Sequence, residues 1–125
     1  MNLPIKHSAD YIKILLDKTR GNRPLTLTIF KKLFEELPEQ ISTIEEALDS
    51  RQYTLARLTT HKLHGSVGFC GLTDLQEPAC VLETSLLNHD YEAANHHFLI
   101  LQQGILNFIR HQTAILADLA NNSEQ

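Results

Sequence analysis

The sequence predicts an all-α fold, an antiparallel up-and-down four-helix bundle preceded by a short accessory N-terminal helix. Three observations favour this class: apolar residues recur at steps of three and four, strand-like alternation is absent, and the connections between the periodic segments are short. A length of 125 residues with 42% hydrophobic residues suits one core, so we expect a single domain over residues 1–125.

The accessory helix is predicted at about residues 8–19. Its apolar residues Ile12, Leu15 and Leu16 lie on one side, and Gly21 is placed to end it. Because this apolar side is narrow, we treat the helix as an accessory to the bundle.

The first bundle helix is predicted at about residues 24–49, with Pro24 in its first turn. Pro38 falls inside the pattern and removes a backbone donor, so we expect either a kink near Leu37 or a break into two helices. Apolar residues mark one face: Ile29, Phe30, Leu33, Phe34, Leu37, Ile41, Ile44 and Leu48.

Three further bundle helices are predicted at about residues 52–70, 73–87 and 90–120. The last one is the clearest, because its apolar positions follow a seven-residue repeat from Tyr91 to Leu119. The helix over 52–70 has one broad face that we expect to be buried, formed by Leu55, Leu58, Leu63, Val67, Phe69 and Cys70.

Composition excludes several classes of function. The formal net charge of -4 disfavours nucleic acid and anionic membranes as partners. No apolar run approaches the roughly 18 to 20 residues of a membrane helix, and no signal peptide opens the chain. Cys70 and Cys80 have small or apolar neighbours, which favours free, buried thiols and a cytoplasmic location. The chain could also be the cytosolic end of a membrane-anchored polypeptide.

The stretch "HKLHGSVGFCG" holds three of the five glycines inside a predicted helix. At about 100° per residue, His61 lies off the apolar face, and Gly65 and Gly68 lie on the same side as His61. A glycine in a helix costs about 1 kcal/mol relative to alanine. The glycines are therefore expected to give clearance, so that another molecule can approach the imidazole of His61.

The charge of this helix supports a partner of opposite sign. Residues 51–70 contain Arg51, Arg57 and Lys62 and no acidic residue, which leaves eight basic and fifteen acidic residues elsewhere. An exposed histidine is a competent nucleophile for phosphoryl transfer when positive charge lies nearby. The chain has no glycine-rich phosphate loop, so we expect the phosphoryl group to come from a partner rather than from bound ATP.

The segment "THKLHGSVGFCGLTDLQEPACVLE" resembles the signature of histidine-containing phosphotransfer (HPt) domains. In that signature a His-x-Leu-Lys-Gly-Ser motif is followed by a glycine ten residues after the histidine and, about one helix later, by a Leu-Glu pair. In particular, the segment is similar to the C-terminal HPt domains of tripartite hybrid sensor kinases of the BarA, GacS and ArcB type. The matching residues are His61, Leu63, Gly65, Ser66, Gly71, Leu82 and Glu83.

The resemblance implies a phosphorelay intermediate of two-component signal transduction, without kinase activity of its own. His61 would accept a phosphoryl group from an aspartate of one receiver domain and pass it to the aspartate of another response regulator. No cofactor would be bound by this chain, and the receiver domain would supply Mg²⁺.

One position departs from the family pattern, since His64 stands where lysine is common. Arg57 or Lys62 could supply the missing charge, or His64 could become protonated next to a dianionic phosphate. We therefore expect His64→Lys to keep or speed transfer. The resemblance also implies that Glu83 could hold Nδ1 of His61 and leave Nε2 to react.

The expected receiver-docking surface combines Arg57, Lys62, Gly65 and Gly68 with residues of the first long helix near Phe30 and Phe34. We expect an isolated monomer, because the predicted apolar stripes are all used inside the bundle.

Two other functions are compatible with the sequence. One is an HPt-like adaptor that docks a receiver domain without accepting phosphate. The other, less favoured, is a metal-binding bundle that uses His61 and His64 together with His96 and His97.

Overall fold

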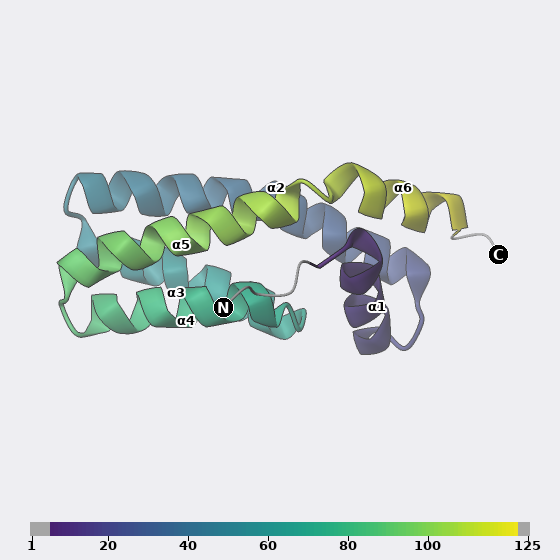
Figure 1. Ribbon diagram of the computed structural model, residues 1–125, viewed down its shortest axis with the longest axis horizontal. Helices are drawn as coiled ribbons and strands as arrows, with labels where there is room; N and C mark the ends of the chain where they lie inside the picture. Colours follow the sequence, from purple (N-terminus) through teal and green to yellow (C-terminus); the bar gives the residue numbers. More distant parts are fainter. Residues whose placement is uncertain (1–5, 123–125) are drawn as a thin grey trace.

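The computed structural model describes residues 6–122 and shows six α-helices in that range, as Figure 1 illustrates. Helices α2 to α5 form the antiparallel bundle, while α1 and α6 pack against the N-terminal half of α2. The all-α class and the short N-terminal helix are confirmed. The bounds are α1 Ser8–Lys18, α2 Arg23–Asp49, α3 Tyr53–Phe69, α4 Thr73–Leu87, α5 Tyr91–Ile109 and α6 Gln112–Asn122.

Helix α2 is continuous over its 27 residues, so the alternative of a break at Pro38 is wrong. Asn22 starts the helix, because its side chain accepts a hydrogen bond from the backbone N–H of Leu25 at 3.0 Å. Pro38 lies on the exposed side of α2, where water can satisfy the carbonyl group that loses its helical donor.

The single helix predicted over residues 90–120 is wrong, because the chain turns at Arg110 and His111. The turn allows α6 to pack on α2 and α1. His111 lies against α1, with its Nδ1 atom 2.8 Å from the Ser8 hydroxyl and its ring 5.3 Å from the ring of Tyr11. The apolar repeat continues across the turn into the buried Ile115, so periodicity alone does not reveal it.

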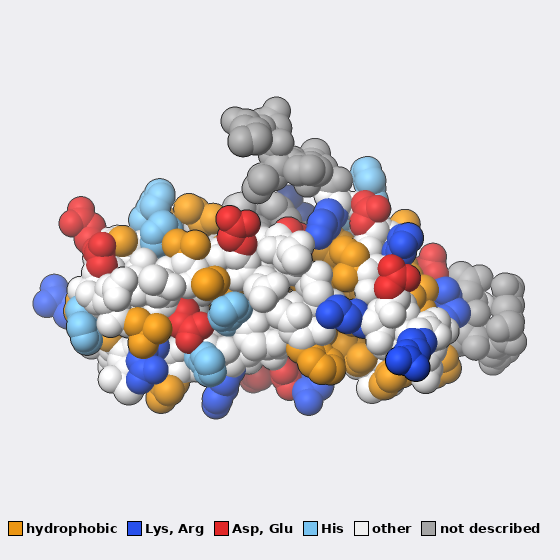
Figure 2. All heavy atoms as spheres, turned by 90° about the horizontal axis from the view of Figure 1, so that it is seen from below, with side chains coloured by type: hydrophobic (Ala, Val, Ile, Leu, Met, Phe, Trp, Pro, Cys, Tyr) orange, Lys and Arg blue, Asp and Glu red, His pale blue; other side chains and the backbone are white. Residues whose placement is uncertain are grey.

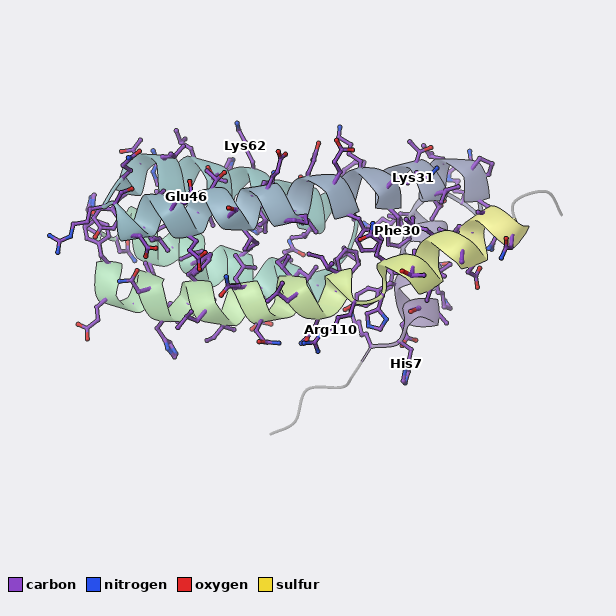
Figure 3. The ribbon with its side chains drawn as sticks, turned by 90° about the horizontal axis from the view of Figure 1, so that it is seen from above. His7, Phe30, Lys31, Glu46, Lys62 and Arg110 are labelled. Carbon is purple, nitrogen blue, oxygen red and sulfur yellow. The ribbon has the colours of Figure 1, made fainter. Side chains whose placement is uncertain are left out.

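An aromatic cluster joins α1, α2 and α5. The ring of Phe108 lies 4.8 Å from that of Phe34 and 5.0 Å from that of Tyr11, and Phe30 stacks on Phe34 at 6.0 Å. Phe30 is 0% exposed and Phe34 is 4% exposed, and Figure 3 shows Phe30 directed inward. The prediction that these two residues belong to a docking surface is therefore wrong, since a receiver domain cannot reach them.

Asp74 connects α1 to the start of α4. The hydroxyl of Tyr11 donates a hydrogen bond to Asp74 Oδ2 at 2.6 Å, and Lys6 Nζ lies 3.4 Å from Asp74 Oδ1. Burial and the hydrogen bond to Asp74 raise the pKa of Tyr11, which therefore stays a neutral donor at physiological pH. This contact holds α1 against the bundle.

The outer surface differs from the sequence prediction in two respects. Both cysteines are free, but only Cys70 is buried, whereas Cys80 is exposed. Large apolar side chains also stay outside the core, including Leu58 and Phe69 on α3 and Leu99 on α5. The reason given for a monomer is therefore wrong, and the monomeric state stays a prediction.

Figure 2 shows the side formed by α3 and α4, where basic, acidic and histidine side chains alternate with hydrophobic ones. No helix within residues 6–122 is long and apolar enough to cross a membrane.

Replacing Phe108 with alanine tests the aromatic cluster. We expect Phe108→Ala to lower the free energy of unfolding by about 3–5 kcal/mol, because the change removes a fully buried ring and leaves a cavity. Urea denaturation followed by circular dichroism measures the change. The matched control is Leu106→Ala on the exposed side of α5, which we expect to cost less than about 1 kcal/mol. Equal losses for both variants would contradict a central role for the cluster.

Candidate functional site

Helix α3 lies between α2 and α4 and carries His61 on its outer side. Its buried residues are Ala56, Thr60, Leu63 and Val67, which recur at steps of three and four and form the core-facing stripe. The Thr60 hydroxyl donates to the Ala56 carbonyl at 2.7 Å, so no polar group is left unpaired on this stripe. His61 follows Thr60 directly and is therefore turned by about 100° away from it around the helix. Its side chain is 69% exposed.

A carboxylate from α4 holds the ring of His61. The Nδ1 atom of His61 lies 2.6 Å from Glu83 Oε2, and the Glu83 side chain is only 15% exposed. An ionised carboxylate can only accept hydrogen bonds, so Nδ1 of His61 must carry the proton that is donated to Glu83. In the neutral ring, Nε2 then bears the lone pair.

His64 binds the other oxygen of the same carboxylate. Its Nδ1 atom lies 2.8 Å from Glu83 Oε1, and its side chain is 26% exposed. The structure therefore brings together all three residues that the sequence suggested for the reaction: His61, His64 and Glu83.

Glu83 is ionised at neutral pH in this arrangement. Partial burial alone would raise the pKa of its carboxyl group, but hydrogen bonds from His64 and His61 and the charges of these rings outweigh burial and lower that pKa. A charged carboxylate facing both Nδ1 atoms also fixes the orientation of the two rings and leaves their Nε2 atoms free. An exposed, oriented Nε2 lone pair is suited to nucleophilic attack.

A close approach between α3 and α4 lies two turns away from the pair formed by His61 and Glu83. A Cβ atom added at Gly68 would lie 3.1 Å from Nε2 of Gln76, so this glycine lets the Gln76 side chain lie against α3. The helices are antiparallel, and seven residues back on α3 and seven residues forward on α4 lead from this contact to His61 and Glu83. A side chain at Gly68 would therefore have to displace the end of the Gln76 side chain, and the role of Gly68 in clearance for a partner stays a prediction.

Gly65 differs from Gly68. A Cβ atom added at Gly65 meets nothing within 4 Å, so packing within the described residues does not require a glycine there. Gly71 has a third role, because its φ of +75° ends α3 in a conformation that side chains disfavour. The open space at Gly65 supports the interpretation that this glycine gives clearance for another molecule.

A groove of about 680 Å³ runs between α2 and α3 beside Gly65. Phe69 forms one end of it and is 77% exposed. Lys32, Glu36 and Lys62 also line it, with Lys32 Nζ 3.8 Å from Glu36 Oε1, and Figure 3 shows Lys62 pointing away from the bundle. The groove therefore combines an exposed ring, positive charge and the open backbone at Gly65.

Phe69 is the site residue that sequence reasoning placed wrongly, since it was assigned to the buried face. Its angular position contained the correct signal: eight residues after His61, it lies only about 80° from His61 around the helix, while the buried Leu63 lies about 160° from it. Leu55 and Leu58 were also assigned to the buried face and are exposed.

Arg57 and Lys62 do not touch the three-residue cluster. Within residues 6–122, no hydrogen bond or ion pair joins either side chain to His61, His64 or Glu83. Both cations stay available to an anion that arrives with a partner.

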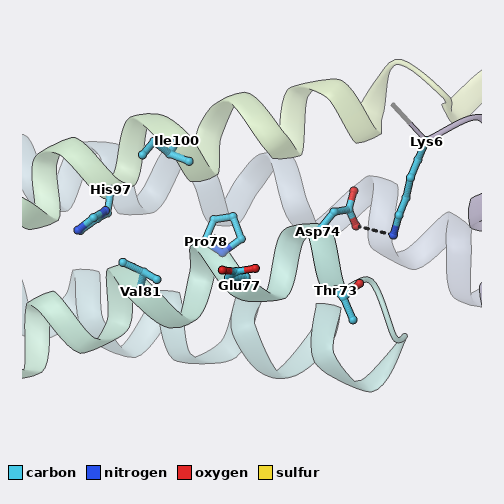
Figure 4. Close-up of a pocket in the computed structure, with 8 residues that line it drawn as sticks. All are labelled: Lys6, Thr73, Asp74, Glu77, Pro78, Val81, His97 and Ile100. Atoms are coloured by element: carbon cyan, nitrogen blue, oxygen red, sulfur yellow. Dashed lines mark hydrogen bonds and ion pairs between the residues drawn. The ribbon is translucent and has the colours of Figure 1, made fainter. Parts of the chain in front are cut away.

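A second groove of about 540 Å³ lies between α4 and α5, and Figure 4 shows its lining. Pro78, Val81 and Ile100 form its apolar part, and Lys6 pairs with Asp74 at one end. These α4 residues lie on the side of the helix opposite Glu83, so this groove is separate from His61.

The histidines do not form a metal site with acidic or cysteine residues. Among the described residues, no group of three or more His, Cys, Asp or Glu side chains could hold a metal ion. His96 and His97 lie on α5 and contact one another, with ring centroids 5.5 Å apart. The metal-binding alternative has no support from this arrangement.

Comparison with known proteins identifies one family. The family model described as the Hpt domain matches residues 28–121, which is more than half of the chain. Neither the curated proteins nor the solved structures give a match.

Stability measurements can separate the roles of Gly65 and Gly71. We expect Gly65→Ala to raise the free energy of unfolding by about 0.5–1 kcal/mol, because alanine favours a helix and has free space here. Gly71→Ala should lower it by about 1 kcal/mol or more, since the backbone is left-handed and the new Cβ would lie 2.9 Å from Lys18 Cε. Urea denaturation measures both. A loss of stability in Gly65→Ala would mean that the isolated protein itself needs this glycine.

Proposed function

The chain belongs to the Hpt domain family, and we propose that His61 is the residue that carries its phosphoryl group. As a member of this family, the chain is a phosphotransfer intermediate in phosphorelay signalling without kinase activity of its own. The observation that supports His61 is its exposed ring, which Glu83 holds by Nδ1 at 2.6 Å so that Nε2 faces outward from the pair.

The proposed reaction is a transfer between two side chains. The lone pair on Nε2 of His61 attacks the phosphorus atom of an aspartyl phosphate in a receiver domain. The N–P bond forms, the bond between phosphorus and the aspartate oxygen breaks, and the aspartate leaves as a carboxylate. The proton stays on Nδ1, and its hydrogen bond to Glu83 is kept throughout. The negative charge of Glu83 offsets the positive charge that develops on the ring. The return step to a second receiver reverses these bond changes.

The receiver domain would supply the Mg²⁺ ion and the acidic pocket. This division of roles agrees with the charges on α3, where Arg57 and Lys62 have no acidic partner in the described residues. Their positive charge favours the approach of an acidic receiver surface.

The docking surface that we propose consists of Lys62, Gly65, Phe69, Lys32 and Ile29, which line the groove between α2 and α3. Phe69 provides an exposed aromatic anchor, and the two lysines form a charged rim. Gly65 lets the partner backbone approach the helix one turn from His61. This surface replaces the predicted one at Phe30 and Phe34.

Hpt domains interact with receiver domains in general. We propose more specifically that the donor is the receiver domain of a hybrid sensor kinase of the BarA, GacS or ArcB type and that the acceptor is a response regulator. The sequence segment around His61 and Glu83 supports this assignment.

Phosphoryl transfer to His61 can be tested directly. The wild-type protein, His61→Gln and His64→Gln are incubated with a phosphorylated receiver domain and Mg²⁺, and acid-labile, alkali-stable phosphate is measured. We expect label on the wild type and on His64→Gln and a loss of at least about 100-fold in His61→Gln, because the nucleophile is absent.

The control is His96→Gln, an exposed histidine on α5, which should be labelled like the wild type. Label on His61→Gln would mean that another histidine is the acceptor. No label on any variant, with receiver binding intact, would favour the adaptor that docks without accepting phosphate.

Binding measurements test the docking surface. We expect Phe69→Ser to weaken receiver binding by roughly tenfold, because the change removes an exposed aromatic anchor without disturbing the core. Gly65→Gln should weaken it at least as much by placing a side chain in the path of the partner. Titration calorimetry with an unphosphorylated receiver measures both, and Leu99→Ser on α5 serves as the matched control. Equal affinity for all these variants would place the receiver elsewhere.

A further inference from the structure

Glu83 is shared between two histidines on the same helix. Its Oε2 atom lies 2.6 Å from Nδ1 of His61, and its Oε1 atom lies 2.8 Å from Nδ1 of His64. Because the two bonds use different oxygens, both histidines can donate to the carboxylate at the same time. His64 is the less exposed of the two rings, at 26% against 69% for His61.

We propose that His64 is a positioning residue for the transfer: it holds Glu83 in the conformation that binds His61, and its charge sets the pH below which His61 stops reacting. This inference rests on the proposed function, because it presupposes that His61 carries the phosphoryl group. It concerns the position where the family commonly has lysine.

The positioning role follows from the flexibility of glutamate. Fixing a glutamate side chain costs up to about 1.5–2 kcal/mol of rotamer entropy. A bond to His61 alone offers weak restraint, because that ring is itself largely free in solvent. The second bond, to the better-buried His64, fixes the carboxylate before a receiver arrives. Loss of this bond should therefore lower the rate of transfer even where His61 is fully neutral.

The charge role follows from the shared carboxylate. When His64 takes up a proton, its positive charge lies next to the Glu83 carboxylate. That carboxylate then stabilises a protonated His61 less well. A positive charge on one ring then opposes a positive charge on the other, because both rings bind the same carboxylate. A protonated His61 has no lone pair on Nε2, so His64 protects the nucleophile as the pH falls.

The other charged and titratable groups around His64 are not changed in the variants and, within residues 6–122, do not bind Glu83 in its place. On α4 they are Glu83 itself and the exposed Cys80, one turn earlier. On α3 they are His61 and Arg57, whose fixed positive charge acts in the same direction as a protonated His64. On its other side, α3 faces α2 across the groove that contains Lys32, Glu36 and Lys62. None of these groups besides His61 and His64 binds Glu83 in the described residues.

The experiment measures the rate of phosphoryl transfer from one phosphorylated receiver domain between about pH 5 and pH 8.5. Four proteins are compared: the wild type, His64→Gln, His64→Lys and His64→Ala. The pH dependence of the receiver itself is common to all of them, so differences between the profiles belong to residue 64. His96→Gln is the matched control and should superimpose on the wild type.

We expect the fall in rate on the acidic side to begin at the highest pH in His64→Gln, at an intermediate pH in the wild type and at the lowest pH in His64→Lys. The profiles should separate in this order, because the variants change one charge beside a partly exposed ring. On the alkaline plateau, His64→Gln and His64→Lys can still donate to Glu83 and should transfer at close to the wild-type rate. His64→Ala cannot, and its plateau should be roughly tenfold lower.

Two results would overturn the inference. Superimposable acidic limbs in the wild type, His64→Gln and His64→Lys would show that the charge of His64 has no effect, and an unchanged plateau in His64→Ala would show that it does not position Glu83. If the wild type accepts no phosphoryl group at any pH, the proposed function fails instead. Histidine ring resonances followed by NMR then still test the coupling, since the titration midpoint of His61 must follow the same order among the variants.

Discussion

The close packing of α3 against α4 is the constraint on which the site depends. Gln76 on α4 lies against Gly68 on α3, and in the same antiparallel register Glu83 lies beside His61 two turns further along. Leu63 and Val67 on α3 and Leu82 and Leu86 on α4 bury the same interface. Hydrophobic burial holds the two helices at this distance, and polar groups at the rim of the same interface orient the reactive ring.

The bundle provides rigidity and the outer rim of α3 provides reactivity. His61 is exposed, as the proposed transfer to and from an aspartate of another protein requires. Its ring is nevertheless restrained by the carboxylate of Glu83, which is mostly buried. The His61 side chain is 69% exposed, which agrees with a partner that completes the reaction centre. Restraint on one nitrogen and freedom on the other is a simple way to make a surface histidine reactive.

Helices α1 and α6 add a second, separate layer at one end of α2. The aromatic contacts of Phe108 with Tyr11 and Phe34 tie this layer to the bundle, and Asp74 fixes α1 to the start of α4. This layer uses side chains on α2 that would otherwise be open to a partner, including Phe30. The docking surface that we propose is consequently the groove beside α3, which Phe69 helps to line.

The sequence by itself determined the all-α class, the order of α1 to α4 and the histidine that we propose as the reactive one. Periodicity of three and four specifies helical faces locally, Gly71 marks the end of α3, and the motif from His61 to Glu83 identifies the family's chemistry. Only the tertiary structure decided which apolar residues are buried, because that depends on what packs against each face. Phe30 and Phe34 pack against Phe108 and are buried, whereas Phe69 is left exposed. The tertiary structure also decided the turn at His111, because that turn is favoured by contacts between distant segments, such as the one from His111 to Ser8. It decided the bond from His64 to Glu83 as well, since residues 19 positions apart meet only when two helices pack in one register.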